Sequence, residues 1–252
     1  GAKHSQRGIV QRIGDLGNIV ATLPRAQTLA RHIRQHNIHI VHTNSLVSLE
    51  GGLAARMTGV PHIWHIRELF NANNPRLNVT LGHWGTRQWV HAMADRVLCV
   101  SKGVLQQFEP YASQFPQKYQ VLYNAIETGL YPPEPRPATH DNKLHVLYTG
   151  RISDGKRFND LIAAMALLKA QWNNSMPVQL HVYGEFIDPA FKHWVSTQIA
   201  QAQLEPHIVF YGYQSDLNPA FLQAHVLVMT SSTEAFGRTM LEALVRGVPV
   251  IA

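Results

Sequence analysis

Residues 231–242 read Ser-Ser-Thr-Glu-Ala-Phe-Gly-Arg-Thr-Met-Leu-Glu, and this stretch decides the fold. The apolar run 224–229 precedes it, and a helix-like pattern follows it from Thr239 to about Arg246. A strand, a polar loop and a helix in this order place the loop and the helix start at the carboxyl edge of a sheet. Open α/β sheets bind their ligands at that edge.

Two carboxylates stand eight residues apart in this stretch, with Glu234 in the predicted loop and Glu242 in the predicted helix. Eight helical residues rise about 12 Å, so the carboxylates do not share a proton and can hold two ends of an elongated ligand. The helix start between them offers free N–H groups and a positive dipole end, which suit a diphosphate. The alternative is that Glu234 caps the helix and Glu242 is a solvated helix residue.

The composition predicts a globular protein that binds anions. The chain has 252 residues, of which 45% are hydrophobic and 15% charged, enough for two ordinary domains. Its net charge of +6 suits anionic ligands and acidic membrane surfaces. Nucleic acid is not an expected partner, because no Lys/Arg cluster is interleaved with aromatic residues. The single cysteine, Cys99, fits a reducing compartment, so we expect a cytoplasmic protein or one peripheral at the inner membrane face.

Predicted strands alternate with predicted helices along the whole chain, which indicates mostly parallel sheets. Asn44 and Ser45 end one such strand and are expected to cap the helix that follows. The expected strands are 38–43, 61–65, 96–101, 119–123, 144–149, 178–183, 207–211, 224–229 and 248–251. The expected helices lie near 23–36, 47–58, 82–94, 158–171, 188–203 and 237–246.

A proline-rich stretch divides the chain. Four prolines lie within residues 131–137, which excludes a helix or a sheet interior and favours a stiff linker. We therefore expect an N-terminal domain at 1–131, a linker at 132–142 and a C-terminal domain at 143–252. Residues 1–18 show no convincing first strand with a Gly-rich loop, and the chain stops directly after a predicted strand. Both domains are expected to be incomplete, and the alternative is a complete protein with shortened domains.

A second motif follows the predicted strand 144–149, where residues 148–156 read Tyr-Thr-Gly-Arg-Ile-Ser-Asp-Gly-Lys. Arg151 and Lys156 place two cations on one loop, which can stabilise the charge of a leaving diphosphate without a metal. Gly150 lets the backbone approach a ligand closely. The alternative is a basic surface turn.

With these two motifs the sequence resembles the GT-B glycosyltransferases, specifically the retaining family 4. The Glu-x7-Glu motif of that family matches Glu234 and Glu242, and its Gly-Arg...Lys motif matches Gly150, Arg151 and Lys156. The closing Gly-Val-Pro-Val-Ile-Ala makes the match more specific. The resemblance implies an α/β fold with two Rossmann-like domains facing a cleft.

The resemblance also implies roles for individual residues. Glu234 would accept hydrogen bonds from the donor sugar and Glu242 from the nucleotide ribose, while Arg151 and Lys156 hold the departing diphosphate. Further contacts to the donor are implied for residues around the same strand ends, namely Gly150, Gly184, Gly212, Phe236, Gly237, Arg238 and Thr239.

His65 is the candidate catalytic residue of the N-terminal half. It ends the predicted strand 61–65, where the family pattern faces the cleft and where it would contact the transferred sugar or stabilise charge. Because the chain has 15 histidines, a structural role is the alternative.

The expected activity is transfer of a sugar from a UDP-, GDP- or ADP-sugar to a hydroxyl acceptor, with retention of the anomeric configuration and no cofactor or metal. The acceptor could be a glycan, a lipid-linked sugar or a small molecule. The sequence holds no Asp-x-Asp pair and too few cysteines for a thiolate site. Two alternatives remain, a nucleotide-sugar epimerase of the same fold and a non-catalytic relative that only binds nucleotide or a partner.

Overall fold

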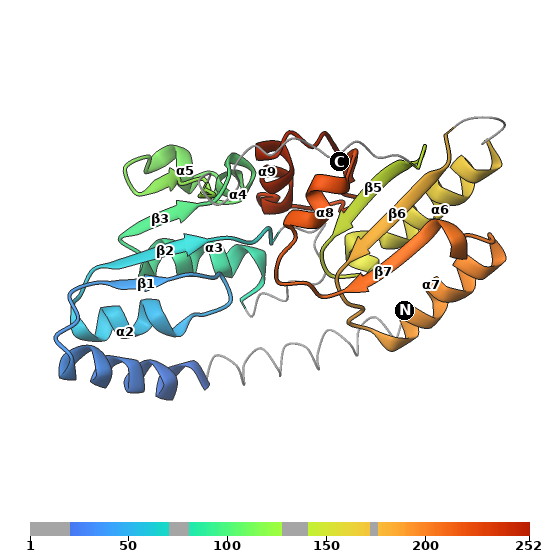
Figure 1. Cartoon of the computed structure of the whole chain (residues 1–252). Coiled ribbons are helices and arrows are strands. Elements are labelled where there is room, and N and C mark those ends of the chain that lie inside the picture. Colours follow the sequence, from blue (N-terminus) through green and yellow to red (C-terminus); the bar gives the residue numbers. More distant parts are fainter. Residues whose placement is uncertain (1–20, 71–80, 128–140, 172–175) are drawn as a thin grey trace. The chain divides into compact units, whose positions relative to one another are not determined.

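Parallel strands form two separate sheets, one in each of two compact units, Gly1–Asn124 and Ala125–Ala252. Each unit alternates strands and helices, as the sequence predicts. The computed structural model, shown in Figure 1, describes residues 21–70, 81–127, 141–171 and 176–252.

The first unit has a four-stranded parallel sheet in the order β1-β2-β3-β4. The central strand β2 is almost wholly buried, and the fully buried Trp64 donates its Nε1–H to the carbonyl of Ser45 at 2.8 Å. Burial on both faces is typical of parallel strands covered by helices. The strands are β1 (Val41–Thr43), β2 (His62–Ile66), β3 (Arg96–Cys99) and β4 (Tyr119–Val121). The helices are residues 21–35, α2 (Glu50–Thr58), α3 (Gly82–Met93), α4 (Lys102–Gln106) and α5 (Tyr111–Gln114).

The second unit has a five-stranded parallel sheet in the order β7-β6-β5-β8-β9. The chain runs outward from β5 to β7 and then returns to the other side of β5, so the strand order reverses between β5 and β8. Such a reversal opens a crevice at the carboxyl ends of the strands. The strands are β5 (Leu144–Thr149), β6 (Val178–Tyr183), β7 (Ile208–Gly212), β8 (Val226–Val228) and β9 (Val250–Ile251). The helices are α6 (Phe158–Ala170), α7 (Pro189–Gln201), α8 (Asn218–Gln223) and α9 (Arg238–Val245).

Helices cover both faces of this second sheet (Figure 1). On one face, Val146 and Tyr148 of β5 pack with buried residues of α6 and α7. On the other face, Leu147 packs with Phe221 of α8 and Ala243 of α9. This alternation along β5 follows from the period of two in a strand, and both faces of β5 are covered by helices.

The nine expected strands are all present, and those at 144–149 and 178–183 have the expected bounds. The first expected strand is too long, because Ile38 and Ile40 lie outside β1 and are about half exposed. The cap predicted at Asn44 and Ser45 is wrong. α2 begins later, after Leu49, and the hydroxyl of Ser45 instead donates to Glu68 Oε1 at 2.6 Å.

Two expectations concern parts of the chain outside the described residues. These are the Pro-rich stretch at 131–137 and the absence of a first strand in 1–18. The domain limits placed at 131 and 143 therefore stay predictions.

Candidate active site

The loops that follow β5 and β8 meet at the point where the strand order reverses. The hydroxyl of Thr230 donates to the carbonyl of Lys156 at 2.8 Å. The ammonium of Lys156 forms an ion pair with Glu234. The structure thus brings together two residues that the sequence predicts on separate motifs, 78 positions apart.

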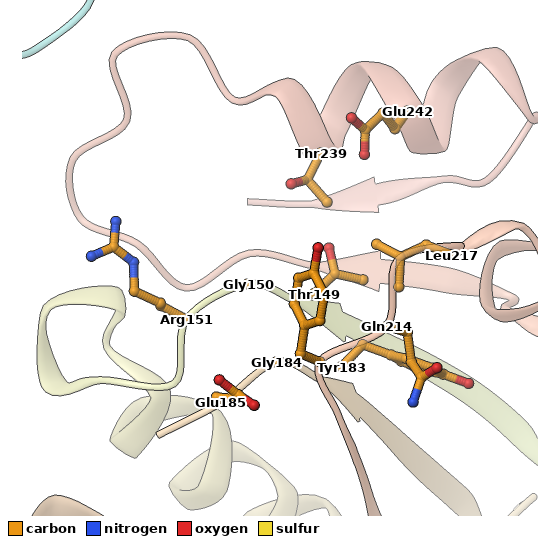
Figure 2. Close-up of a pocket in the computed structure, with 11 residues that line it drawn as sticks. Thr149, Gly150, Arg151, Tyr183, Gly184, Glu185, Gln214, Leu217, Thr239 and Glu242 are labelled. Carbon is orange, nitrogen blue, oxygen red and sulfur yellow. The ribbon is translucent and has the colours of Figure 1, made fainter. Parts of the chain in front are cut away.

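A cavity of about 320 Å³ lies at the same edge of the second sheet (Figure 2). Thr239 and Glu242 project from α9 toward the strand ends that carry Thr149 and Tyr183. Arg151 lies on the loop after β5, at the side of the cavity. The lining residues are Thr149, Gly150, Arg151, Tyr183, Gly184, Glu185, Tyr213, Gln214, Leu217, Thr239 and Glu242.

Glycines at the ends of three neighbouring strands bring the backbone close to the cavity. The N–H of Gly150 donates to the carbonyl of Tyr183 at 2.9 Å, and the N–H of Gly184 donates to that of Gly212 at 2.8 Å. A Cβ atom on Gly184 would lie only 1.9 Å from the carbonyl oxygen of Gly150, so no other residue fits there without a shift of backbone. At Gly150 and Gly184 the cavity is therefore lined by backbone, next to the side chains of Thr149 and Tyr183 that end β5 and β6.

The start of α9 is open to an anion. The helix begins at Arg238, directly after Gly237, which has a φ of 80°. Among the described residues, no side chain caps this helix start. The N–H of Met240 donates to the carbonyl of Gly237, so the N–H groups of Arg238 and Thr239 and the positive end of the dipole are the ones available to a ligand. The exposed Arg238 donates to Glu242 Oε1 at 3.3 Å, one turn further along the helix.

Tyr148 holds the loop that carries Arg151. Its hydroxyl donates to the carbonyl of Arg151 at 2.9 Å, and its ring packs edge-on against Phe158 in the core. Burial, and then the charge of Glu234, raise the pKa of Tyr148, so the phenol stays protonated and keeps donating at neutral pH.

The predicted donor-site residues fall into three groups. Gly150, Arg151, Gly184, Thr239 and Glu242 line the cavity. The pair Lys156 and Glu234 joins the two loops that flank the β5–β8 reversal. The remaining four do not line the cavity. The carbonyl of Gly212 accepts the N–H of Gly184, and Phe236 lies in the loop after β8. Gly237 directly precedes α9, and Arg238 is the first residue of that helix.

Six further lining residues were not predicted. Tyr183, Glu185 and Tyr213 adjoin strand-end glycines, and that position was the signal that could have found them. Gln214 and Leu217 come from the segment between β7 and α8, and the sequence carries no signal for them. Thr149 is the last residue of β5.

His65 belongs to the first unit and is almost fully buried at the carboxyl end of β2. Its ring stacks on His42, with centroids 5.7 Å apart. Burial, and then the charges of Arg67 and His42, lower its pKa, so the ring is neutral at pH 7. Its Nε2 is buried and finds no hydrogen-bond partner among the residues that the structure describes. A neutral imidazole with an unsatisfied nitrogen suits a hydrogen bond to a ligand better than it suits stabilisation of negative charge.

Within the described ranges, no three His, Cys, Asp or Glu side chains are grouped so that they could hold a metal ion. Nor does any helix in that part of the chain have the length and apolar character that a membrane span needs.

Comparison with known families identifies the chain. Residues 3–130 match the family model Glycosyltransferase Family 4, which covers just over half of the chain. The chain belongs to glycosyltransferase family 4. The second half of this family 4 chain, residues 134–252, matches the model Glycosyl transferases group 1.

Two curated relatives act in lipopolysaccharide synthesis by their names. Lipopolysaccharide 1,6-galactosyltransferase of Salmonella typhimurium is 30% identical over 167 residues, which make up 63% of this family 4 chain and 43% of that protein. The lipopolysaccharide core biosynthesis glycosyltransferase LpsE of Rhizobium meliloti is 26% identical over 174 residues, or 68% and 48% of the two chains. The chain thus spans about half the length of these relatives.

Solved structures share the fold. Anabaena HepE, solved with UDP and glucose, aligns with a TM-score of 0.75 and 21% identity, over 89% of this chain and 61% of its own. The lipopolysaccharide outer core galactosyltransferase WaaB aligns with a TM-score of 0.65 and 20% identity, over 92% and 61%. The predicted α/β fold of the GT-B class is confirmed.

Proposed function

We propose that this chain transfers a sugar from a nucleotide-diphosphate sugar to a hydroxyl acceptor, with retention of the anomeric configuration. The observation that carries the proposal is the cavity of the second unit. There the backbone of Gly150 and Gly184, Thr239 at the start of α9, the cation of Arg151 and the carboxylate of Glu242 line one cavity. The Lys156–Glu234 pair joins the loops after β5 and β8 at the same edge of the sheet.

Each part of a nucleotide sugar has a matching group in this arrangement. Glu242 would accept hydrogen bonds from the ribose hydroxyls, and the N–H groups at the start of α9 would receive the diphosphate. Arg151 and Lys156 would stabilise the charge that builds on the diphosphate as the sugar leaves, so two protein cations do the work that a metal does elsewhere. Glu234 would orient the sugar through its hydroxyls.

The proton balance needs no protein base. The acceptor oxygen bonds to the anomeric carbon, the bond from that carbon to the diphosphate breaks, and a phosphate oxygen of the donor takes the acceptor proton. Attack on the face that the leaving group vacates retains the configuration. The neutral His65 of the first unit would offer one hydrogen bond to a ligand bound at the end of β2.

A uridine diphosphate sugar is the proposed donor. HepE was solved with UDP, and another relative, the GtfA subunit of Streptococcus gordonii, is named as a UDP-N-acetylglucosamine transferase. For the acceptor we propose a glycan or a lipid-linked saccharide, since relatives are named for lipopolysaccharide and for a diphospho-undecaprenol substrate. Work on such an acceptor would place the protein at the inner membrane face.

Nucleotide titration tests the proposal. UDP should bind the chain in a calorimeter, and Arg151→Gln should weaken its affinity about 10-fold to 100-fold, the loss expected for hydrogen bonds to a charged group. Arg157→Gln is the matched control, because Arg157 lies on the same segment but is paired with Asp160. If the Arg151 variant binds UDP as tightly as the wild type, Arg151 does not hold the diphosphate.

Turnover separates an enzyme from a binding protein. Release of UDP from a UDP-sugar in the presence of a saccharide acceptor should be measured on a version that covers the full length of the relatives. Binding without any turnover across a panel of donors and acceptors would favour a non-catalytic relative.

A further inference from the structure

Arg67 joins two segments of the first unit at the carboxyl edge of its sheet. Its Nη2 donates to Asn124 Oδ1 at 2.9 Å, and its Nη1 donates to Asn44 Oδ1 at 3.4 Å. Arg67 directly follows β2, Asn44 directly follows β1, and Asn124 lies three residues beyond β4. A cation and two amides thus come together at the edge where open α/β sheets bind their ligands. We call these three residues the Arg67 cluster.

A buried imidazole lies on the same face of the sheet. Side chains two positions apart along a strand share a face, so His65 precedes Arg67 on one strand as His42 precedes Asn44 on its neighbour. The contacts follow this order, since His65 stacks on His42 and Arg67 donates to Asn44. Only 8% of His65 is exposed, and its Nε2 finds no hydrogen-bond partner within the described part of the chain. A buried nitrogen without a partner marks a position that a ligand would satisfy.

The acidic neighbour of Arg67 is occupied elsewhere. Glu68 Oε1 accepts from the hydroxyl of Ser45 at 2.6 Å, and Glu68 Oε2 accepts the backbone N–H groups of Leu46 and Arg67, each at 3.0 Å. In the described ranges no carboxylate forms an ion pair with the guanidinium of Arg67, whose partners are neutral amide oxygens. The cation therefore has no counter-charge at contact distance.

The hydrogen bonds within the Arg67 cluster leave donors for a ligand. In both asparagines the amide oxygen is turned to Arg67, so the NH₂ groups are the part left for a further partner. Arg67 has five N–H groups, and these contacts use two of them. An oxyanion suits such a set of donors, because all of its exposed atoms accept and it carries the opposite charge.

A phosphate fits the Arg67 cluster better than a carboxylate does. The donors come from three segments of the chain, and a tetrahedral phosphate can present three oxygens to them, whereas a planar carboxylate presents two. The diphosphate of the donor already has proposed partners in the second unit, namely Arg151, Lys156 and the start of α9. An anion site in the first unit is therefore left for the other substrate.

We propose that the Arg67 cluster binds a phosphate group of the acceptor, which makes the acceptor a phosphorylated saccharide. Arg67 supplies the charge, and the NH₂ groups of Asn44 and Asn124 orient the phosphate. His65 offers its Nε2 to the same ligand. This inference rests on the proposed function, since it names the chemical class of the acceptor.

The first test detects the anion at the Arg67 cluster and needs no nucleotide. The full chain, labelled with ¹⁵N in its asparagine side chains, is titrated with inorganic phosphate at pH 7.5 and constant ionic strength. The NH₂ signals of Asn44 and Asn124, each assigned by its loss in the corresponding Ser variant, should shift and saturate. Arg67→Gln should weaken the affinity for phosphate about 10-fold or more, the loss expected for hydrogen bonds to a charged group. Acetate at equal concentration should shift both signals less.

Arg25→Gln is the matched control, because Arg25 belongs to the same unit but is paired with Glu50. It should bind phosphate as the wild type does. Arg67→Lys keeps the charge and loses the planar fork, so its affinity should lie between those of the wild type and Arg67→Gln. If Arg67→Gln fails to fold, Arg67→Lys decides, and wild-type affinity in that variant would overturn the inference. Signals that do not move with phosphate, or that respond equally to acetate, would overturn it as well.

The second test separates the acceptor from the donor. In a calorimeter, Arg67→Gln should bind UDP as tightly as the wild type, whereas Arg151→Gln binds it more weakly. An equal loss of UDP affinity in both variants would assign the Arg67 cluster to the donor and overturn the acceptor class. Failure of the wild type to bind UDP would instead overturn the proposed function, and the phosphate titration would still decide whether the anion site exists.

Discussion

Gly184→Ala should destabilise the second unit much more than Gly150→Ala. Both glycines have backbone angles that L side chains rarely adopt, with φ of 145° and 137°. Each substitution therefore costs about 1–3 kcal/mol of backbone strain. The loss of freedom in the unfolded chain offsets about 0.4–1 kcal/mol of this in both variants.

The two positions differ in what the new Cβ meets. At Gly150 no described residue other than its chain neighbours comes within 4 Å of the new Cβ. At Gly184 the Cβ would lie 1.9 Å from the carbonyl oxygen of Gly150 and 2.8 Å from its carbonyl carbon. These are backbone atoms that cannot rotate away, so the strand ends must part. Parting breaks the hydrogen bonds from Gly150 to Tyr183 and from Gly184 to Gly212, at about 1 kcal/mol each. We expect Gly184→Ala to lose about 2 kcal/mol more than Gly150→Ala.

The assay is urea unfolding of both variants followed by circular dichroism, with UDP affinity measured on the same samples. Because both substitutions lie in the second unit, the difference between them does not depend on the first. Equal free energies of unfolding for the two variants would show that the strand ends are not packed as the structure has them.

Three further predictions concern charge and burial. Glu234→Gln should lower the melting temperature by no more than a few degrees, because a partly exposed ion pair is worth less than about 1 kcal/mol. It should weaken UDP-sugar binding about 10-fold. UDP itself is freed from competition for Lys156 and should bind no more weakly than to the wild type. Cys99 is fully buried, and burial raises the pKa of its thiol to about 12. A disulfide reagent at pH 8 should therefore label Cys99 only after unfolding. Rapid labelling of the native protein would contradict this burial. Burial lowers the pKa of His62 below its usual 6.5. The neutral ring therefore stabilises the fold fully above pH 6.5, and the free energy of unfolding should fall as the pH drops from 6.5 toward the lowered pKa. His62→Gln should show a shallower fall when both proteins are unfolded with urea over this pH range.

The inner strands β2, β5 and β6 were predictable because each is a short, mainly apolar run in which nearly every residue is at least partly buried. β5 and β6 matched their expected bounds, since turn-like residues flank both. α4, α5 and α8 were missed because helices of five, four and six residues are too short to show a helical period. The failed cap at Ser45 has a different cause, because its hydroxyl is held by Glu68, 23 residues away, and a local pattern cannot show such a contact.

The residues of the candidate site also divide into those that the sequence could predict and those that depend on tertiary contacts. Gly150, Arg151 and Glu242 were predictable because the motif places each at a strand end or on the first turns of a helix. Gln214 and Leu217 reach the cavity only because the segment after β7 crosses back over the sheet to α8, and that path is set by packing against the core. Residues of the two motifs could therefore be placed at the cavity from sequence, whereas lining residues that depend on tertiary packing could not.

The Lys156–Glu234 pair connects these charged groups to selectivity. The cation proposed to hold the diphosphate and the carboxylate proposed to hold the sugar neutralise each other in this structure, with both side chains partly exposed. A diphosphate alone can recruit Lys156 only by leaving Glu234 without its cation. A nucleotide sugar offers phosphate oxygens to the lysine and hydroxyls to the carboxylate at once, so both groups exchange one partner for another. The pair would thus favour an intact donor over the nucleoside diphosphate that remains after transfer, which is the preference that product release requires.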